Sequence, residues 1–173
     1  MAKVGGKPVI VYWPLRGRAE VMRLALSLAN QDWIEQTVDY AAMKSDKEAF
    51  PFGQAPAYKD GGLHILQSGT ILRYIARKYD LEGKSDEELV INDMAMETVE
   101  SLLGKYLTLI YQDQLSDAAK ENFVKNHISK ENIHGRNGGA HIDYLEWFLR
   151  KSGKPFITGD RCCIGDLAIW WVC

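Results

Sequence analysis

The turn after the first apolar run carries the residues best suited to chemistry. Residues 9–13 (Val-Ile-Val-Tyr-Trp) form this run and Pro14 stops it, so the phenol of Tyr12 stands where a buried strand ends. A dithiol enzyme would carry a Cys-x-x-Cys motif at such a turn, but no cysteine precedes Cys162, which excludes disulfide exchange there. A phenol can donate a hydrogen bond to a thiolate and lower the pKa of a bound thiol from its usual value of about 8.5. Standing alone, Tyr12 would be better explained as a packed strand-end tyrosine.

Further candidate ligand contacts surround Pro56. The segment 54–56 (Gln-Ala-Pro) lies just before an expected strand, where a cis bond to Pro56 would turn the Ala55 backbone outward to pair with a peptide ligand. The sequence leaves this isomer open. Lys47 lies in the polar stretch before the turn and could hold a carboxylate of the ligand, although a lone lysine is usually solvated surface.

Gln67 and Ser68 stand at the start of an expected helix. The free N–H groups and the positive dipole end of a helix favour a carboxylate at such a position. The simpler interpretation is that Ser68 is a plain N-cap. Tyr12, Lys47, the 54–56 turn and the 67–68 pair nevertheless follow one another in an order that predicts one binding site for a small thiol.

The elements that must position these residues follow the order βαβ and then ββα. The connection Asp60-Gly61-Gly62 is a three-residue turn of the kind that a tight hairpin uses. Because a strand–helix–strand crossover is right-handed, the first unit predicts a parallel pair of strands, and the whole predicts a thioredoxin-like α/β domain. The expected strands are 9–13, 33–40, 57–59 and 63–66, and the expected helices are 18–29 and 71–79.

The rest of the chain predicts an all-helical domain. Ser85, with Glu88 three positions later, forms a capping box that opens a long helix over 86–111. A second helix is expected over 116–149 and a third from Ile164, the second being interrupted or bent at Gly135, Gly138 and Gly139. The predicted domains are therefore 1–81, thioredoxin-like and ligand-binding, and 86–173, all-helical, with a linker at 82–85.

Composition and charge are those of an ordinary soluble protein. Of the 173 residues 46% are hydrophobic and 25% are charged, which excludes a disordered or disulfide-built chain. The net charge of −2 argues against a general electrostatic partnership with nucleic acid or an anionic membrane. The N-terminus lacks the apolar region of a signal peptide, and no run approaches the roughly 18 apolar residues of a membrane span. We therefore expect a cytoplasmic protein.

Neither the histidines nor the cysteines predict a metal site. His127, His134 and His141 recur every seven residues, which on one helix would separate neighbours by roughly 10 Å, and we interpret all three as surface residues. The three cysteines lie within the last twelve positions and lack the spacing of zinc ligands. Cys162 and Cys163 are expected to be partly buried thiols that pack rather than react.

Three segments carry a resemblance to a known family. They are 12–20 (Tyr-Trp-Pro-Leu-Arg-Gly-Arg-Ala-Glu), 52–56 (Phe-Gly-Gln-Ala-Pro) and 67–77 (Gln-Ser-Gly-Thr-Ile-Leu-Arg-Tyr-Ile-Ala-Arg). They resemble the cytosolic glutathione transferases of the tyrosine type, near the pi and sigma classes. The resemblance is close over residues 8–112, including 105–111, and looser beyond, where 156–160 and Asp166 resemble the start of the family's core helix.

This resemblance implies a glutathione site in the first domain. Tyr12 would stabilise the thiolate, and the Ala55 backbone before Pro56 would pair with the cysteinyl unit. Gln67 and Ser68 would contact the γ-glutamyl carboxylate, and Lys47 with Gln54 would contact the glycyl carboxylate. Arg18 would lie near the sulfur, and Trp13 would also contact glutathione. The pocket of the second substrate would be lined by Trp13, Leu15, Leu107 and Tyr111, for which core packing is the alternative.

The resemblance also implies an activity and an assembly. The activity is conjugation of glutathione, as co-substrate and without a cofactor, to hydrophobic electrophiles, as in detoxification. The alternatives are a glutathione-dependent isomerase of the prostaglandin-synthase type and a non-catalytic, crystallin-like binding or structural protein. The assembly is a homodimer, in which Phe52 resembles the aromatic key that pi-type subunits insert into their neighbour; otherwise Phe52 tucks into its own domain. Glu100 and Ser101 would lie near the interface, although Ser101 stands where the pi-like pattern has an acidic residue.

The C-terminal region departs from the family pattern in two ways. Cys163 occupies the Ser/Thr N-cap position three residues before Asp166, and a thiol is a poor cap, which predicts a helix start weaker by about 1 kcal/mol. Apolar residues then continue at helical spacing up to Cys173, where a family member would run on for several helices. We expect either a fragment or truncated form, or a partner that covers this face.

Overall fold

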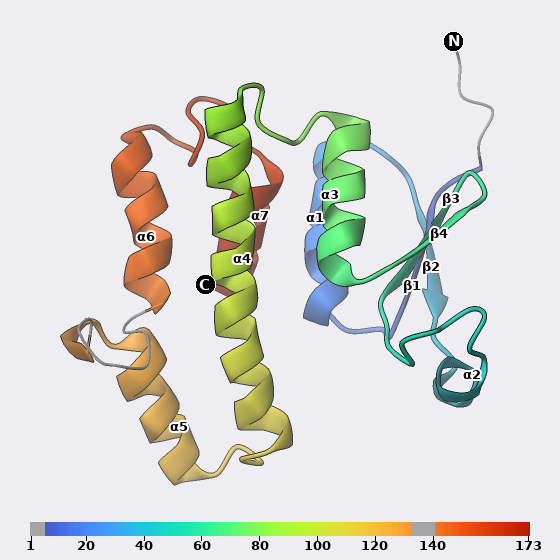
Figure 1. Ribbon diagram of the computed structural model, residues 1–173, viewed down its shortest axis with the longest axis horizontal. Helices are drawn as coiled ribbons and strands as arrows, with labels where there is room; N and C mark the ends of the chain where they lie inside the picture. Colours follow the sequence, from blue (N-terminus) through green and yellow to red (C-terminus); the bar gives the residue numbers. More distant parts are fainter. Residues whose placement is uncertain (1–5, 133–140) are drawn as a thin grey trace. The chain divides into compact units, whose positions relative to one another are not determined.

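The chain is divided into two units, one built on a four-stranded sheet and one made of helices. The computed structural model describes residues 6–132 and 141–173, and the two units are Met1–Leu81 and Glu82–Cys173 (Figure 1). The first unit combines strands and helices and the second is helical, so the expected fold class is confirmed.

The sheet of the first unit is mixed, with the strand order β2-β1-β3-β4. β1 (Val9–Tyr12) pairs in parallel with β2 (Ile34–Thr37) and antiparallel with β3 (Ala57–Asp60), which pairs antiparallel with β4 (Leu63–Leu66). A parallel pair requires a crossover connection, which the 3₁₀ turn η1 (Gly17–Ala19) and the helix α1 (Glu20–Leu28) supply. This is the thioredoxin-like arrangement that the element order predicts.

Helices cover both faces of the central strands. Because side chains alternate along a strand, Ile10 and Tyr58 point to one face, and Val11 and Ala57 to the other. On the first face α1 and α3 (Ser68–Tyr79) lie side by side (Figure 1), and the Tyr58 and Tyr74 rings meet there. On the second face α2 (Tyr40–Ser45) completes a smaller apolar cluster of Val11, Val38, Met43, Phe50 and Ala57. The β1 backbone that leads to Tyr12 is therefore held from both faces.

Two local expectations in this unit are wrong. The strand expected over 33–40 ends at Thr37, because Asp39 accepts a hydrogen bond from the N–H of Ala42 and caps α2. The turn between β3 and β4 has two residues rather than three, since Asp60 still pairs with Leu63. Gly61 and Gly62 form it with φ angles of 54° and 89°, as a type I′ hairpin turn requires.

The second unit is organised along α4 (Asp86–Tyr111), a helix of 26 residues. Ser85 caps it as expected, its Oγ accepting the N–H of Glu88 over 3.3 Å. The Glu88 carboxylate accepts the N–H of Lys84 rather than that of Ser85, so the capping box is displaced by one residue. The buried side of α4, against which other helices of this unit pack, contains Ala95, Met96, Val99, Leu102 and Leu103.

The helix expected over 116–149 is not continuous. α5 (Asp117–Phe123) runs into the π-helix η2 (Val124–Ile128), and the extended conformation of Ser129 (ψ 127°) ends it. A 3₁₀ turn, η3 (Lys130–Asn132), follows, and α6 (His141–Ser152) is a separate helix. The breaks predicted at Gly135, Gly138 and Gly139 lie outside the described residues.

The last helix, α7 (Ile164–Val172), begins where the sequence predicts. Asp166 accepts hydrogen bonds from the backbone N–H groups of Cys163 and Ile157, both at 2.9 Å, and from the Cys163 thiol at 3.0 Å. Burial raises the pKa of Cys163 to about 12 and that of Cys162 to about 11. Both cysteines are therefore protonated at neutral pH, and Cys163 is fully buried.

Candidate functional site

Tyr12 lies at the end of β1 with only 8% of its surface exposed. Its phenolic oxygen accepts a hydrogen bond from the backbone N–H of Arg18 over 3.2 Å. A hydroxyl oxygen can accept this hydrogen bond and still offer its O–H to an anion in the site. Tyr12 therefore offers a hydrogen-bond donor at the end of β1.

The loop between β1 and η1 curls tightly over this phenol. Gly17 has a φ angle of +41°, and a Cβ atom at this position would lie 2.6 Å from the Tyr12 oxygen and 2.8 Å from Leu15 Cδ1. Any side chain at position 17 would displace either the phenol or the loop. Glycine is thus required for the loop to approach Tyr12 closely enough to present the N–H of Arg18.

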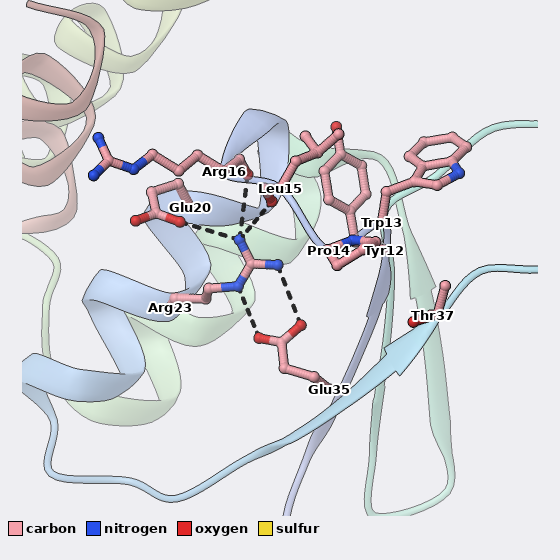
Figure 2. A pocket seen from close by; sticks show the side chains of 9 residues that line it. All are labelled: Tyr12, Trp13, Pro14, Leu15, Arg16, Glu20, Arg23, Glu35 and Thr37. Atoms are coloured by element: carbon pink, nitrogen blue, oxygen red, sulfur yellow. Dashed lines mark hydrogen bonds and ion pairs between the residues drawn. The ribbon is translucent and has the colours of Figure 1, made fainter.

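A cavity of about 400 Å³ opens beside the phenol (Figure 2). Trp13 and Leu15 line it, and the Trp13 ring stands edge-on to Tyr12 with their centroids 5.1 Å apart. Their predicted role in binding the second substrate stays a prediction. The sequence did not single out the other lining residues, which are Pro14, Arg16, Glu20, Arg23, Glu35 and Thr37. The charged residues among them come from α1, β2 and the loop. They can be grouped only once it is known that the β1–α1–β2 crossover brings these segments together.

Four expected ligand contacts meet near the N-terminus of α3. Nη1 of Arg18 donates to Oγ of Ser68 over 3.3 Å, and the Gln67 amide donates to Oε1 of Gln54 over 3.5 Å. Segments that are far apart in the sequence are joined by these contacts. Gln67 has a φ angle of +69°, a conformation that costs a non-glycine residue roughly 1–3 kcal/mol and that concentrates at ligand sites.

Ser68 is not the N-cap of α3, which corrects one expectation. It is the first helical residue, and Gln67 occupies the N-cap position without a capping hydrogen bond from its side chain. The Ser68 hydroxyl is engaged by Arg18 instead. The first N–H groups of α3 consequently have no side-chain cap, and they lie where a carboxylate could accept from them.

Two lysines flank the turn before β3. Lys47 is exposed, and a Cβ atom at Gly53 would lie 3.6 Å from its ammonium nitrogen. Lys44 donates to the Gly53 carbonyl over 2.9 Å. Sequence reasoning did not single out Lys44, which lies on α2, whereas Lys47 lies beyond the end of that helix at Ser45. The pair places two positive charges beside Gln54.

The Ala55–Pro56 bond is cis, which is the isomer that the sequence left open. Ala55 is half-buried, and Pro56 is buried directly before β3. Ala55 also follows Gln54, the partner of Gln67, so its backbone lies beside the cluster at the N-terminus of α3.

Comparison with known proteins identifies the family. Residues 8–77 match the family model described as Glutathione S-transferase, N-terminal domain. The chain is 34% identical over 163 residues to a glutathione S-transferase of Dirofilaria immitis, an alignment that covers 93% of this chain and 73% of that protein. The chain belongs to the glutathione S-transferase family. It is also 35% identical over 161 residues to glutathione S-transferase P of Bos taurus, covering 91% of this chain and 70% of that protein.

A solved structure supports the same assignment. The pi-class glutathione S-transferase of Onchocerca volvulus matches with a TM-score of 0.77 at 30% identity, covering 96% of this chain and 76% of that one. The resemblance to the glutathione S-transferases that the three sequence motifs predict is thereby confirmed.

Other residues that the glutathione S-transferase motifs implicate remain predictions. Leu107 is half-buried and Tyr111 is 77% exposed on α4 in the second unit, so their grouping with Trp13 and Leu15 is untested. Phe52 is 59% exposed and is not tucked into its own unit. Glu100 and Ser101 are exposed on α4, and Ser101 Oγ lies 3.4 Å from Nε2 of His141.

The interpretation of the histidines as surface residues is wrong for His141. This residue is only 4% exposed, and its ring lies 5.2 Å from that of half-buried His127, centroid to centroid. The end of η2 and the separate start of α6 bring them together, whereas one continuous helix would have kept them apart. His134 lies outside the described residues.

Within residues 6–132 and 141–173, no three His, Cys, Asp or Glu side chains are grouped as a metal ion would need. In the same ranges, no helix is both long and apolar enough to cross a membrane.

Proposed function

We propose that this chain conjugates the thiolate of glutathione to electrophilic small molecules. The observation that carries the proposal is the Tyr12 phenol, which accepts the N–H of Arg18 and borders a cavity of about 400 Å³. The phenol O–H would donate to the glutathione sulfur, and the cavity would receive the electrophile. The family membership of the chain supports the same activity.

The catalytic contribution of Tyr12 is stabilisation of an anion. A hydrogen bond to the charged form lowers the pKa of the bound thiol, so more of it is thiolate at neutral pH. The thiol proton leaves to solvent, and the sulfur then attacks the electrophilic carbon. A carbon–sulfur bond forms as the leaving group departs with its bonding electron pair. Tyr12 keeps its proton throughout, and no covalent enzyme intermediate is required.

The cluster near α3 would hold the ends of the tripeptide. Ser68 and Gln67, with the uncapped N–H groups of α3, would bind the γ-glutamyl carboxylate, and Arg18 would lie near the sulfur. Lys47 and Gln54 would bind the glycyl carboxylate, with Lys44 adding a second positive charge. The Ala55 backbone would pair with the cysteinyl unit. In this scheme glutathione is a co-substrate and no further cofactor takes part.

The electrophile would contact Trp13 and Leu15 in the first unit, and Leu107 and Tyr111 on α4. We further propose that the protein acts in the cytoplasm as a homodimer with Phe52, Glu100 and Ser101 at the interface. The exposure of Phe52 supports this assembly, because a partner that covers a ring that is 59% exposed removes apolar surface from water.

A conjugation assay tests the activity. The chain is incubated with glutathione and a nitro-activated aryl chloride, and formation of the thioether is followed by its absorbance. We expect saturable turnover that falls at neutral pH when Tyr12 is replaced by Phe. Turnover no faster than the solution reaction, with calorimetry showing that glutathione binds, would favour the non-catalytic alternative. Isomerisation of a prostaglandin endoperoxide without thioether formation would favour the isomerase.

A further inference from the structure

Arg23 on α1 joins three segments of the first unit at the wall of the Tyr12 cavity (Figure 2). Its Nε and Nη2 donate to the two carboxylate oxygens of Glu35 on β2, over 2.7 and 3.2 Å. Its Nη1 donates to Glu20 one turn earlier on α1, over 3.0 Å. The same nitrogen also donates to two backbone carbonyls of the loop that covers Tyr12, those of Leu15 at 2.9 Å and Arg16 at 3.3 Å.

These contacts are partly shielded from water, and a further hydrogen bond supports the Glu35 carboxylate. The Arg23 side chain is 18% exposed and that of Glu20 is 21% exposed. The Trp33 indole donates to Glu35 Oε1 over 2.8 Å and so helps to fix the carboxylate that accepts from Arg23. Hydrogen bonding to the Arg23 guanidinium holds the pKa of Glu35 below its usual value. Both partners are therefore charged at neutral pH.

The two loop carbonyls that Arg23 holds immediately precede the residues that touch the Tyr12 phenol. Fixing the carbonyl of Arg16 fixes the plane of the peptide that leads into Gly17. Gly17 takes a positive φ angle, with the phenolic oxygen so close that no Cβ atom would fit. The next residue is Arg18, whose N–H donates to that oxygen. The position of the Arg18 N–H thus depends on a segment that Arg23 ties to α1 and β2.

We propose that Arg23 is a positioning residue for thiolate activation: by anchoring the loop carbonyls of Leu15 and Arg16 to Glu20 and Glu35, it holds the Arg18 N–H on the Tyr12 phenol. This inference rests on the proposed function of Tyr12. With the acceptor side of the phenol occupied, the O–H proton points toward the thiolate. Without the anchor, the loop loosens and the phenol can turn its proton to other acceptors.

The contacts require an arginine. The planar guanidinium places two nitrogens on one carboxylate while the third reaches two carbonyls and a second carboxylate. A lysine ammonium is a single point charge and cannot span these partners at once. Lysine would keep the charge at this position and lose the bridge, which separates positioning from simple electrostatics.

Arg23→Gln and Arg23→Lys test the inference, with Arg150→Gln as the matched control. Arg150 also bonds two carboxylates, those of Glu146 and Asp143, but it lies on α6 in the second unit. The first measurement is the ultraviolet titration of the thiol of bound glutathione. We expect both Arg23 variants to raise its pKa by about one unit, which lowers the thiolate fraction about tenfold at a pH well below that pKa. Arg150→Gln should leave this pKa unchanged.

Steady-state kinetics give the second measurement. In the Arg23 variants kcat should fall about tenfold near pH 6.5, and most of the loss should disappear near pH 9, where the thiol ionises without help. KM for glutathione should change less than threefold, because Ser68, Gln67 and Lys47 are untouched. A lower melting temperature with an unchanged pH profile would mean a purely structural role and would overturn the proposal. So would a lysine variant that behaves as the wild type.

A third measurement needs no glutathione and separates this inference from the proposed function. Amide hydrogen exchange at Arg18 should be at least tenfold faster in Arg23→Gln than in the wild type, because the N–H would leave the phenol more often. If the wild type fails to conjugate glutathione but Arg18 exchange accelerates, the function is wrong and the anchor stands. If the wild type is active and Arg18 exchange is unchanged, the anchor is wrong. Should Arg23→Gln not fold, Glu35→Gln removes one charge from the same bridge and should accelerate Arg18 exchange by a smaller factor; exchange as slow as in the wild type would count against the anchor.

Discussion

The guanidinium of Arg18 donates to the hydroxyl of Ser68 over 3.3 Å, across fifty residues of sequence. The backbone N–H of the same arginine donates to the Tyr12 phenol. One residue therefore connects the group that would face the sulfur of glutathione with the helix end that would face its γ-glutamyl carboxylate. Substitutions at the two ends should separate binding from activation.

Ser68→Ala should weaken glutathione binding without destabilising the protein. Removing one hydrogen-bond partner of a carboxylate costs about 1–3 kcal/mol. Because Ser68 is not the N-cap of α3, the melting temperature should stay the same. Isothermal calorimetry and thermal unfolding check the two halves of this prediction. Ser27→Ala, at an exposed position on α1, is the control. Equal affinity in Ser68→Ala and the wild type would exclude a role for this hydroxyl in binding.

Tyr12→Phe should leave glutathione affinity nearly unchanged and raise the pKa of the bound thiol. A hydrogen bond to a charged group contributes about 1.5–3 kcal/mol, which corresponds to roughly one to two pKa units. Turnover at neutral pH should fall accordingly and recover in alkaline solution. Ultraviolet titration of the bound thiolate measures the shift, with Tyr40→Phe, at a 63% exposed tyrosine, as the control. The same thiol pKa in Tyr12→Phe and the wild type would show that another group activates the sulfur.

Some residues of this site can be predicted from the sequence and others cannot. Tyr12, Gln54, Gln67 and Ser68 lie in contiguous motifs whose neighbours set their conformation locally, so they can be predicted. Arg23 and Glu35 cannot, because their pairing depends on the crossover that lays β2 beside β1. The short helix α2 was missed for a different reason. Its first residue, Tyr40, falls within the strand expected over 33–40, and the side-chain cap at Asp39 begins a helix there instead.

The histidine pair shows the same limit in the helical unit. The seven-residue spacing of the histidines predicts a distance between their side chains that applies only if they lie on one continuous helix. Ser129 ends η2, and His127 and His141 then meet edge to face with their centroids 5.2 Å apart. This contact cannot be predicted from either segment alone, since it arises from the packing of η2, α4 and α6.

The burial of His127 makes the stability of the helical unit depend on pH. Burial, together with the positive charge of Lys105, lowers the pKa of His127 below its ordinary value of about 6.5. In the window between the lowered pKa and that ordinary value, the unfolded chain binds more protons than the folded one. The free energy of unfolding therefore decreases as the pH falls below about 6.5.

Thermal unfolding at a series of pH values between about 7.5 and 5.5 measures this effect, since the range spans the ordinary pKa of histidine. His127→Phe should keep the ring contact with Phe123 and flatten the pH dependence in this range. His64→Phe, at an exposed position on β4, is the control and should behave as the wild type. A wild-type melting temperature that does not change over this range would refute the assignment, as would an unchanged slope in His127→Phe.

The final prediction concerns assembly. Phe52 exposes 59% of its surface in the turn before Gly53, which is a large apolar area for one chain to leave to water. We expect a homodimer in which this ring is buried against the neighbouring subunit, and light scattering should give twice the chain mass at micromolar concentration. Phe52→Ser should become monomeric or aggregate, because a hydroxyl cannot replace the buried ring. Leu28→Ser removes a comparably exposed apolar side chain from α1 and should leave the dimer intact. A monomeric wild type would overturn the assembly. A dimer that survives Phe52→Ser would assign the interface to surfaces other than this turn.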